Sequence, residues 1–375
     1  MQTRKTYHVW IGIVFLLLVC PSSSYSEERT SQNDPAIKKW LKKQPQADAN
    51  GDGVLTQAEA MAFRKNPDKD TGAKAAKAGG RDSAASTPTL SNVSYGPHPR
   101  DVLDLWKAES KAPSPVLIFF HGGSFKAGDK SVVLNRPLFG DCLEAGVSVV
   151  SANYRFSSDA PYPAPMLDGA RAVQFVRSKA KEWNIDPSKV ALSGSSAGGT
   201  MALWIALHDD LANPKSDDPI HRQSTRVRCV AAYSAPSTIA PEILRARNAG
   251  VGMLNGAIAQ LFGVATGEDL EKPENRKRLL DFCPLTHATK DDPPLYVSYQ
   301  GDETEGATTS TRTTTSTPST EGGAPKASSI HDVSLGLPLK EKYDALGLEF
   351  HIFSRSKPIP PKGEVQFLLK HFAGR

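Results

Sequence analysis

Short hydrophobic runs alternate with amphipathic stretches along residues 89–375. The runs at residues 115–120, 147–152 and 190–192 are uninterrupted. Such runs are typical of strands that are buried on both faces of a parallel sheet. Residues 167–181 instead carry apolar side chains at the spacing of a helix with one buried face. The members of that face are Ala170, Val173, Val176 and Ala180.

The same alternation continues to the end of the chain. Residues 199–208 predict a helix directly after the strand at 190–192, residues 295–300 and 348–353 predict two further strands, and residues 364–372 predict a last helix. Strands that alternate with helices favour an α/β fold. We therefore expect a mostly parallel central sheet flanked by helices.

Residues 1–26 have the pattern of a secretory signal peptide. Two basic residues precede an apolar run at residues 9–20, and small residues at 24–26 offer a cleavage site. This run is shorter than the roughly 20 residues that span a bilayer, so we favour cleavage over a membrane anchor or a lipid on Cys20. The sequence predicts a secreted or periplasmic protein without stable membrane insertion.

Residues 27–72 predict a small helical module around a calcium-binding loop. Residues 48–59 read DANGDGVLTQAE and fit the 12-residue EF-hand pattern at every position. A chance Asp- and Gly-rich turn is the other interpretation. Residues 36–43 and 56–64 predict the flanking helices, and Leu55 is expected to pack beneath the loop. The predicted calcium ligands are Asp48, Asn50, Asp52, the backbone carbonyl of Val54, and Glu59.

Two segments of low complexity divide the rest of the chain. Residues 73–88 are small and polar and predict a linker, and residues 306–329 are rich in Thr and Ser and predict a flexible insertion in the large domain. The net charge of +5 falls to about +3 without the first 26 residues, which is too small to indicate a nucleic-acid partner. Cleavage would leave three cysteines, so at least one would be a free thiol or form an intermolecular bridge.

The strongest catalytic motif is Gly-Ser-Ser-Ala-Gly at residues 194–198. A predicted strand precedes it and a predicted helix follows, which is the context of a nucleophile elbow. Gly194 and Gly198 remove side chains that would collide in so tight a turn. Ser196 would then be presented at a helix N-terminus, where developing negative charge is stabilised.

A second motif follows the strand at residues 115–120. His121-Gly122-Gly123 forms a turn there whose backbone N–H groups can point at an oxyanion, together with the N–H of Ala197. A plain turn is the alternative. We expect His121 to be a structural turn residue rather than a general base.

These motifs resemble the α/β-hydrolase fold, and within it the hormone-sensitive-lipase-like and feruloyl-esterase-like carboxylesterases. The resemblance is carried by HGGSF at 121–125, NYR at 153–155, PAP at 163–165, Asp168, and GSSAG at 194–198. It implies a Ser–acid–His triad in that chain order, acting on carboxylic esters. It implies Ser196 as the nucleophile, with oxyanion N–H groups from Gly123, Ser124 and Ala197.

The triad acid departs from the pattern of this family. The resemblance implies an aspartate three residues after Gly301, but Thr304 stands there. Asp302 is the aspartate nearest the strand end, and we favour it. Glu303 and Glu305 are alternatives, and a solvated acidic turn without a catalytic role is the other interpretation.

The position expected for the general base departs further from the pattern of this family. The resemblance implies a histidine just before the last helix, but Lys362 stands there, and a lysine with a pKa near 10.4 is protonated at neutral pH. His331 and His351 are the leading replacements, and we take His331 as the predicted base. His287 and His371 lie in less suitable places.

Three functions compete on this sequence. The first is a secreted carboxylesterase acting on small-molecule esters or on acyl or feruloyl esters of polysaccharides. The second is a protein of the same fold that binds an ester or glycan without turnover, because the acid and base lie away from their usual positions. The third is a serine peptidase of this fold. It is less favoured because the resemblance through the HGG turn is to enzymes that act on small esters. Calcium is the only cofactor that the sequence indicates.

Overall fold

The chain forms two compact units, residues 1–80 and residues 81–375. The structure is a computed structural model, and it describes residues 35–43, 55, 87–247, 254, 256–302 and 331–374. The predicted signal peptide, nearly all of the predicted linker, and the predicted insertion at 306–329 lie outside these residues.

In the first unit, the described part is one helix and one buried side chain. Helix α1 (Pro35–Lys43) covers the segment expected to enter the calcium loop. Leu55 is buried, as expected for the residue beneath that loop. The five predicted calcium ligands lie outside the described residues, so calcium binding stays a prediction.

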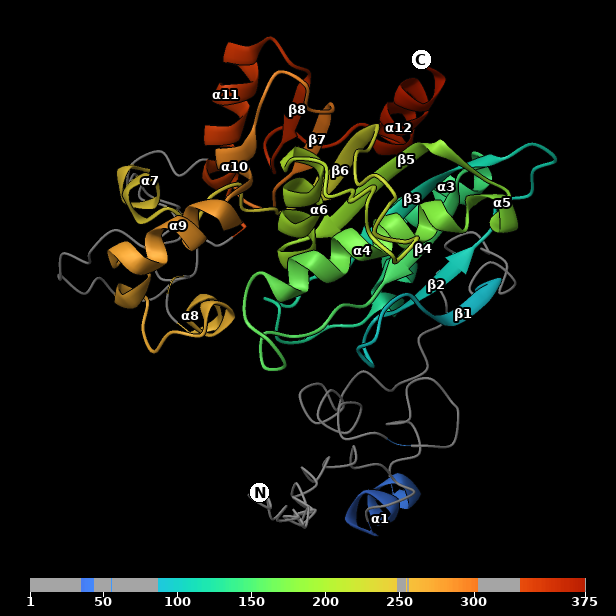
Figure 1. Cartoon of the computed structure of the whole chain (residues 1–375), viewed down its shortest axis with the longest axis horizontal. Helices are drawn as coiled ribbons and strands as arrows, with labels where there is room; N and C mark the ends of the chain where they lie inside the picture. The colour runs from blue at the N-terminus through green and yellow to red at the C-terminus, as the bar shows by residue number, and fades with distance from the viewer. Residues whose placement is uncertain are drawn as a thin grey trace, which may run out of the picture. The chain divides into compact units, whose positions relative to one another are not determined.

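An eight-stranded sheet forms the centre of the second unit, in the order β1-β2-β4-β3-β5-β6-β7-β8 (Figure 1). β1 pairs with β2, and β2 with β4, in antiparallel fashion, and all later pairs are parallel. The mostly parallel sheet is therefore confirmed. The strands are β1 (Leu90–Ser94), β2 (Val102–Trp106), β3 (Ser114–Phe120), β4 (Ser148–Ala152), β5 (Ile185–Ser195), β6 (Cys229–Tyr233), β7 (Leu295–Ser298) and β8 (Phe350–Phe353).

Helices and short 3-10 turns connect these strands (Figure 1). The helices are α3 (Pro137–Glu144), α4 (Ala164–Ser178), α5 (Ala180–Trp183), α6 (Ala197–Leu207), α7 (Pro241–Ala246), α8 (Ala257–Phe262), α9 (Pro273–Phe282), α10 (Pro284–His287), α11 (Leu337–Leu346) and α12 (Gly363–Ala373). The 3-10 turns are η4 (Lys130–Asn135), η6 (Glu268–Glu271) and η7 (Val333–Leu335).

The sheet has a separate apolar core on each face, because successive side chains of a strand point to opposite sides. In β3, Ile118 and Phe120 pack with α4 and α6 in the larger core. Leu117 and Phe119 pack in the second core with side chains of α3 and α12. Helices thus cover both faces, which explains why β3 is an unbroken hydrophobic run.

Some element boundaries differ from the sequence prediction. The strand expected at residues 190–192 is longer in the structure, where β5 covers Ile185–Ser195. Ser114 pairs with Ile185, and after a shift of register residues 116–120 of β3 pair with residues 190–194. The helix expected from residue 167 begins at Ala164, where Pro165 lies in the first turn, and proline is tolerated there because that N–H lacks an intrahelical partner.

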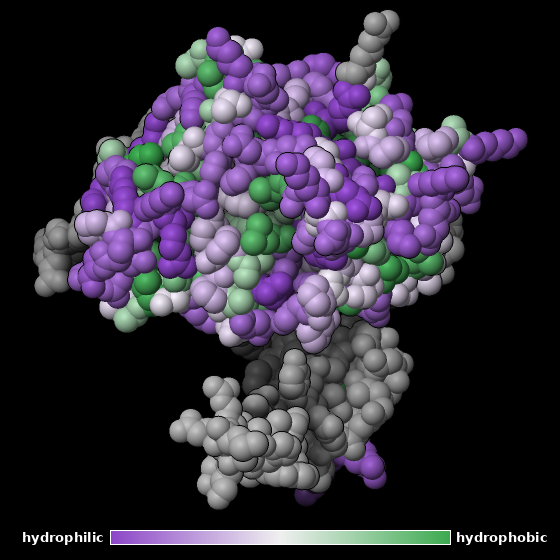
Figure 2. Space-filling view, viewed as in Figure 1, coloured by the Kyte–Doolittle hydropathy of each residue, from purple (hydrophilic) through white to green (hydrophobic). Residues whose placement is uncertain are grey.

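The three described cysteines, Cys142, Cys229 and Cys283, are buried free thiols. Within the described ranges, no helix is both long and apolar enough to cross a membrane. The face drawn in Figure 2 is mostly hydrophilic, with small separate hydrophobic patches.

Candidate active site

Ser196 occupies a sharp turn between β5 and α6. Its backbone angles are φ 53° and ψ −117°, which strain a residue with a side chain by about 1–3 kcal/mol. A Cβ on Gly194 would lie 2.2 Å from Gly198 O, and a Cβ on Gly198 would lie 2.2 Å from Phe120 O. Only glycine fits at either position, and this turn is the nucleophile elbow that the motif predicts.

The turn after β3 packs directly against this elbow. A Cβ on Gly122 would lie 2.8 Å from Ser195 O. Gly123 and Ser124 both have positive φ, at 112° and 55°. Among the described residues, no hydrogen bond engages the N–H of Gly123 or Ser124. Ala197 is the first residue of α6, where the N–H has no partner within the helix. These N–H groups are therefore available to an oxyanion.

His121 holds this turn in place. It is fully buried and stacks on Tyr154 with ring centroids 4.3 Å apart. Its Nδ1 donates to Gly122 O at 2.7 Å, while its Nε2 accepts from Arg100 Nη2 at 3.3 Å. Burial lowers the pKa of His121 to about 4. The ring is thus neutral and fully engaged, as expected for a structural residue.

The structure places His331 beside Ser196. Its Nε2 lies 3.2 Å from Ser196 Oγ. The backbone N–H groups of Gln300 and Gly301 donate to His331 O at 3.2 and 3.4 Å, just after β7. Burial lowers the pKa of His331, so the imidazole is neutral at neutral pH. A neutral imidazole at this distance can accept the serine proton.

The other candidate bases have partners elsewhere. His351 lies on β8 with Nε2 2.7 Å from Glu349 Oε1, and His371 of α12 faces the same carboxylate at 3.6 Å. Lys362 is the N-cap residue of α12, and its Nζ lies 3.2 Å from Glu144 Oε2 of α3. The fourth candidate, His287, belongs to a cluster described below.

Asp302 contacts the loop that follows β8. Its carboxylate accepts a hydrogen bond from the backbone N–H of Ser356 at 2.7 Å. Hydrogen bonds from Ser354 and Ser356 lower its pKa. No contact among the described residues joins Asp302 to His331. The alternatives Glu303 and Glu305 lie outside the described residues, so the identity of the acid stays a prediction.

A small apolar cavity adjoins Ser196. Its volume is about 150 Å³, comparable to a cavity that holds one benzene molecule. α8 and α9 contribute its outer wall. It is lined by Ser124, Phe125, Ser196, Ala197, Thr200, Pro236, Ile239, Ala257, Ile258 and Phe282. Ile239, Ile258 and Phe282 cannot be recognised from the sequence, because no local motif marks an apolar residue that packs beside a distant serine.

A group of polar side chains, which no sequence motif marks, lies beside the elbow. Arg136 Nη2 donates to Ser195 Oγ at 2.7 Å, and its guanidinium lies 4.8 Å from the ring centroid of Tyr233. The Ser196 N–H donates to Tyr233 O at 2.8 Å. Glu364 of α12 lies close by, and burial raises its pKa to about 7. These contacts fix both residues that precede α6.

Comparison with known proteins identifies the family. A model of the BD-FAE family matches residues 103–308, which is more than half of the chain. The chain belongs to the BD-FAE family. BD-FAE proteins are α/β-hydrolase carboxylesterases, in agreement with the sheet order and the elbow described above.

The BD-FAE chain has curated relatives in Mycobacterium tuberculosis. It is 27% identical over 212 residues to the probable carboxylic ester hydrolase LipM, covering 55% of this chain and 46% of LipM. It is 32% identical over 147 residues to the esterase LipQ, covering 38% of this chain and 34% of LipQ. The chain therefore spans less than half the length of either relative.

Solved structures share the fold of this BD-FAE protein. A truncated carbohydrate esterase from gut microbiota matches with a TM-score of 0.57 and 19% identity, covering 76% of this chain and 96% of that one. An acetyl ester-xyloside bifunctional hydrolase from Caldicellulosiruptor lactoaceticus matches with a TM-score of 0.50 and 21% identity, covering 71% and 82%. At these identities the likeness shows the fold alone.

Proposed function

We propose that this protein is a secreted serine carboxylesterase that removes short acyl groups from carbohydrate esters. The observation that carries the proposal is the 3.2 Å distance between His331 Nε2 and Ser196 Oγ. It pairs a strained serine with a neutral imidazole, beside unengaged N–H groups and a small apolar cavity.

In the proposed reaction, Ser196 Oγ attacks the ester carbonyl carbon while His331 Nε2 accepts the serine proton. The carbonyl oxygen becomes an oxyanion and receives hydrogen bonds from the N–H groups of Gly123, Ser124 and Ala197. The intermediate collapses, and His331 gives the proton to the departing alcohol. A water molecule then releases the acyl group by the same steps. Asp302 remains the proposed acid that orients His331, with Glu303 and Glu305 as alternatives.

The cavity volume supports a short acyl group. About 150 Å³ accommodates an acetyl to butyryl chain and no long fatty chain. Carbohydrate esters are proposed because two proteins with the same fold are a carbohydrate esterase and an acetyl ester-xyloside bifunctional hydrolase. Secretion rests on the sequence pattern of residues 1–26, and calcium binding rests on the loop at residues 48–59.

The test compares hydrolysis of p-nitrophenyl acetate by the wild-type chain, Ser196→Ala and His331→Gln. We expect both variants to lose about 10³-fold or more in kcat/KM. His351→Gln is the matched control, because His351 is half exposed and pairs with Glu349; it should keep the wild-type rate. Wild-type turnover no faster than Ser196→Ala would overturn the proposal and favour ligand binding without turnover.

Substrate class is tested with a series of acyl lengths and with an acetylated polysaccharide. We expect the rate to fall steeply between the butyrate and octanoate esters, because the longer chain overfills the cavity. Acetate release from acetylated xylan should depend on Ser196. A preference for octanoate, or for a feruloyl ester over acetate, would contradict the short-acyl part of the proposal.

A further inference from the structure

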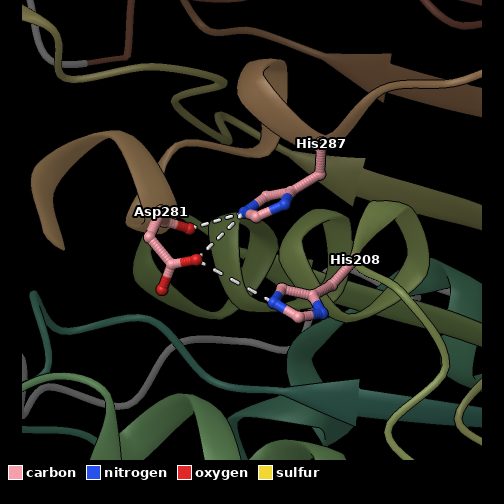
Figure 3. Close-up of side chains that lie close together, drawn as sticks. All are labelled: His208, Asp281 and His287. Atoms are coloured by element: carbon pink, nitrogen blue, oxygen red, sulfur yellow. Dashed lines mark hydrogen bonds and ion pairs between the residues drawn. The ribbon is translucent and has the colours of Figure 1, made fainter. Parts of the chain in front are cut away.

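Three side chains converge at the ends of three helices, away from the elbow. His208 directly follows α6, Asp281 lies near the end of α9, and His287 ends α10 (Figure 3). One ligand atom from each lies within 4.8 Å of the others. The Nε2 atoms of His208 and His287 each lie 4.0 Å from Asp281 Oδ1. We call this group the His208 cluster.

The tautomer of His208 leaves a lone pair facing the carboxylate. Its Nδ1 lies 3.1 Å from the carbonyl oxygen of Asp209, which can only accept, so Nδ1 carries the hydrogen. In the neutral ring, Nε2 is then an acceptor that faces the Asp281 carboxylate, also an acceptor. Two acceptors that face each other need a proton, a bridging water or a metal cation between them, and the second imidazole of His287 beside them favours the metal. A backbone carbonyl that fixes the tautomer in this way is also the usual support of a metal-binding histidine.

Asp281 is held so that one oxygen remains available. The hydroxyl of Tyr162 donates to Asp281 Oδ2, and Oδ1 is left facing the two imidazoles. The side chain of Asp281 is 45% exposed, while those of His208 and His287 are 20% and 16% exposed. The cluster is therefore half-sheltered, with solvent access for an ion and for a water ligand.

His287 can turn a lone pair toward the same point. Its Nε2 now donates to the carbonyl oxygen of Asp281 at 2.6 Å, and Trp204 Nε1 donates to that oxygen at 2.8 Å. If the ring proton of His287 moves to Nδ1 through solvent and the ring turns from this carbonyl oxygen toward Asp281 Oδ1, Nε2 becomes a ligand atom and the ring stays neutral. The carbonyl keeps its hydrogen bond from Trp204, so no buried acceptor is left without a donor.

We propose that His208, Asp281 and His287 form a binding site for a divalent transition metal of the zinc class. Two imidazoles and one carboxylate suit zinc, whereas calcium and magnesium prefer oxygen ligands throughout. Tetrahedral ligands at about 2.1 Å from zinc lie about 3.4 Å apart. The two nitrogen-to-carboxylate separations are 4.0 Å, and all three ligand atoms lie within 4.8 Å of one another. Side-chain movements of about 1 Å would bring them to this value, and water would supply the fourth ligand.

The site is structural, because it lies far from the reacting serine. α6 has 11 residues, and Ser196 and His208 flank its two ends, so they are separated by about 18 Å at 1.5 Å per residue. Asp281 adjoins Phe282, which lines the acyl cavity. A bound metal would therefore connect α9 and α10 to α6, the helix that follows the elbow. It would also stabilise the part of the cavity wall that Phe282 forms.

The test titrates the full chain with zinc chloride, in a thiol-free reductant and with saturating calcium to occupy the predicted EF-hand loop. We expect one zinc per chain, with an affinity that falls at least 10-fold in His208→Gln and in Asp281→Asn. His221→Gln is the matched control, since His221 is 51% exposed and lies near Asp218 instead; it should bind as the wild type. Zinc should raise the unfolding temperature of the wild type but not that of Asp281→Asn. Equal zinc affinity in all four proteins would overturn the proposal.

A second measurement needs no variant. X-ray absorption at the zinc edge of the wild-type chain with one equivalent of metal should show nitrogen and oxygen ligands, with the scattering pattern of two imidazoles. Sulfur ligands would point to the cysteines and overturn the proposal. A wild-type chain that binds no zinc would also overturn the proposal.

Discussion

At the scale of single residues, the site depends on backbone conformations that most side chains resist. Ser196, Ser124 and Phe125 all have positive φ, and each lies at the turn where the elbow meets the loop after β3. Such strain persists only where the surrounding structure fixes it. Here the close approach of Gly198 to Phe120 O fixes it, so the glycines are as necessary as the serine.

Replacing Gly198 by alanine tests this packing. The added Cβ would meet backbone oxygens at 2.2 and 2.4 Å, which cannot move without shifting β3 or α6. We expect a loss of about 2 kcal/mol or more in unfolding free energy and a loss of nearly all esterase activity. Gly374→Ala is the control, because its Cβ meets only His371 O at 3.8 Å and should change neither quantity. Urea unfolding measures both variants, and wild-type activity in Gly198→Ala would contradict this description of the elbow.

We expect the pH dependence of catalysis to follow the ionisation of one residue, His331. Burial lowers the pKa of His331 below its usual 6.5, and only the neutral ring accepts a proton from Ser196. We expect kcat/KM to rise as pH increases through a pKa below 6.5 and then to stay level through neutral pH. The pH profile for p-nitrophenyl acetate checks this. An activity that keeps rising to pH 9 or 10 would instead indicate a lysine such as Lys362 as the base.

At the scale of elements, α12 joins the second core to the elbow. Its apolar side chains Val365, Leu368 and Phe372 pack against the sheet, while Glu364 in its first turn is largely but not fully buried. The hydroxyl of Tyr233 lies close enough to Glu364 to offset part of the cost of burying this carboxyl, while Tyr296 OH, among the described residues, has no hydrogen-bond partner. A buried carboxyl without full compensation favours its neutral form.

The carboxyl group of Glu364 makes the free energy of unfolding depend on pH. Burial raises the pKa of Glu364 from 4.5 to about 7, Asp141 of α3 adds to the effect, and Tyr233 and Arg136 offset part of it. Between these two values the folded chain holds a proton that the unfolded chain releases. The unfolding free energy therefore falls as pH rises from about 4.5 to 7, by roughly 3 kcal/mol.

Glu364→Gln should remove this pH dependence, because an amide does not ionise. We expect the variant to match the wild type near pH 4.5 and to exceed it by up to roughly 3 kcal/mol at pH 8. Glu341→Gln is the control, since the Glu341 side chain is 64% exposed and pairs with Arg247. Denaturant unfolding at the two pH values measures the difference. Identical pH profiles for Glu364→Gln and the wild type would contradict the assignment.

At the scale of the whole molecule, the chain divides into a small N-terminal unit and the unit that holds the sheet and the site. The second unit contains both apolar cores and all of the described residues around Ser196. A unit with its own cores is expected to fold alone.

A fragment of residues 81–375 tests this independence. We expect cooperative unfolding and esterase activity within about twofold of the full chain, because the fragment retains both cores. Millimolar calcium, a suitable range for an extracellular site, should leave its unfolding temperature unchanged. Calcium should bind the full chain, and Asp48→Ala should remove that binding. Calcium stabilisation of the fragment would show that the second unit has a calcium site of its own.

The contiguous elements of this protein could be predicted from the amino-acid sequence alone. Strand, GSSAG turn and helix are contiguous, and so are the strand and the HGG turn after it, so hydrophobic pattern and glycine spacing were enough to predict β3, β5, α6 and Ser196. The alternation of strands and helices likewise predicted the mostly parallel sheet, since each element is encoded within about ten residues.

The side chains that surround Ser196 depend on the tertiary fold. His331 is 135 residues away in sequence, and hydrogen bonds from the backbone just after β7 hold it beside the elbow. The wall formed by Ile258 and Phe282, and the His208 cluster, likewise join segments that no motif connects. The local hydrophobic pattern predicts which face of a helix or strand is buried. The residues that pack against that face depend on how the whole chain folds.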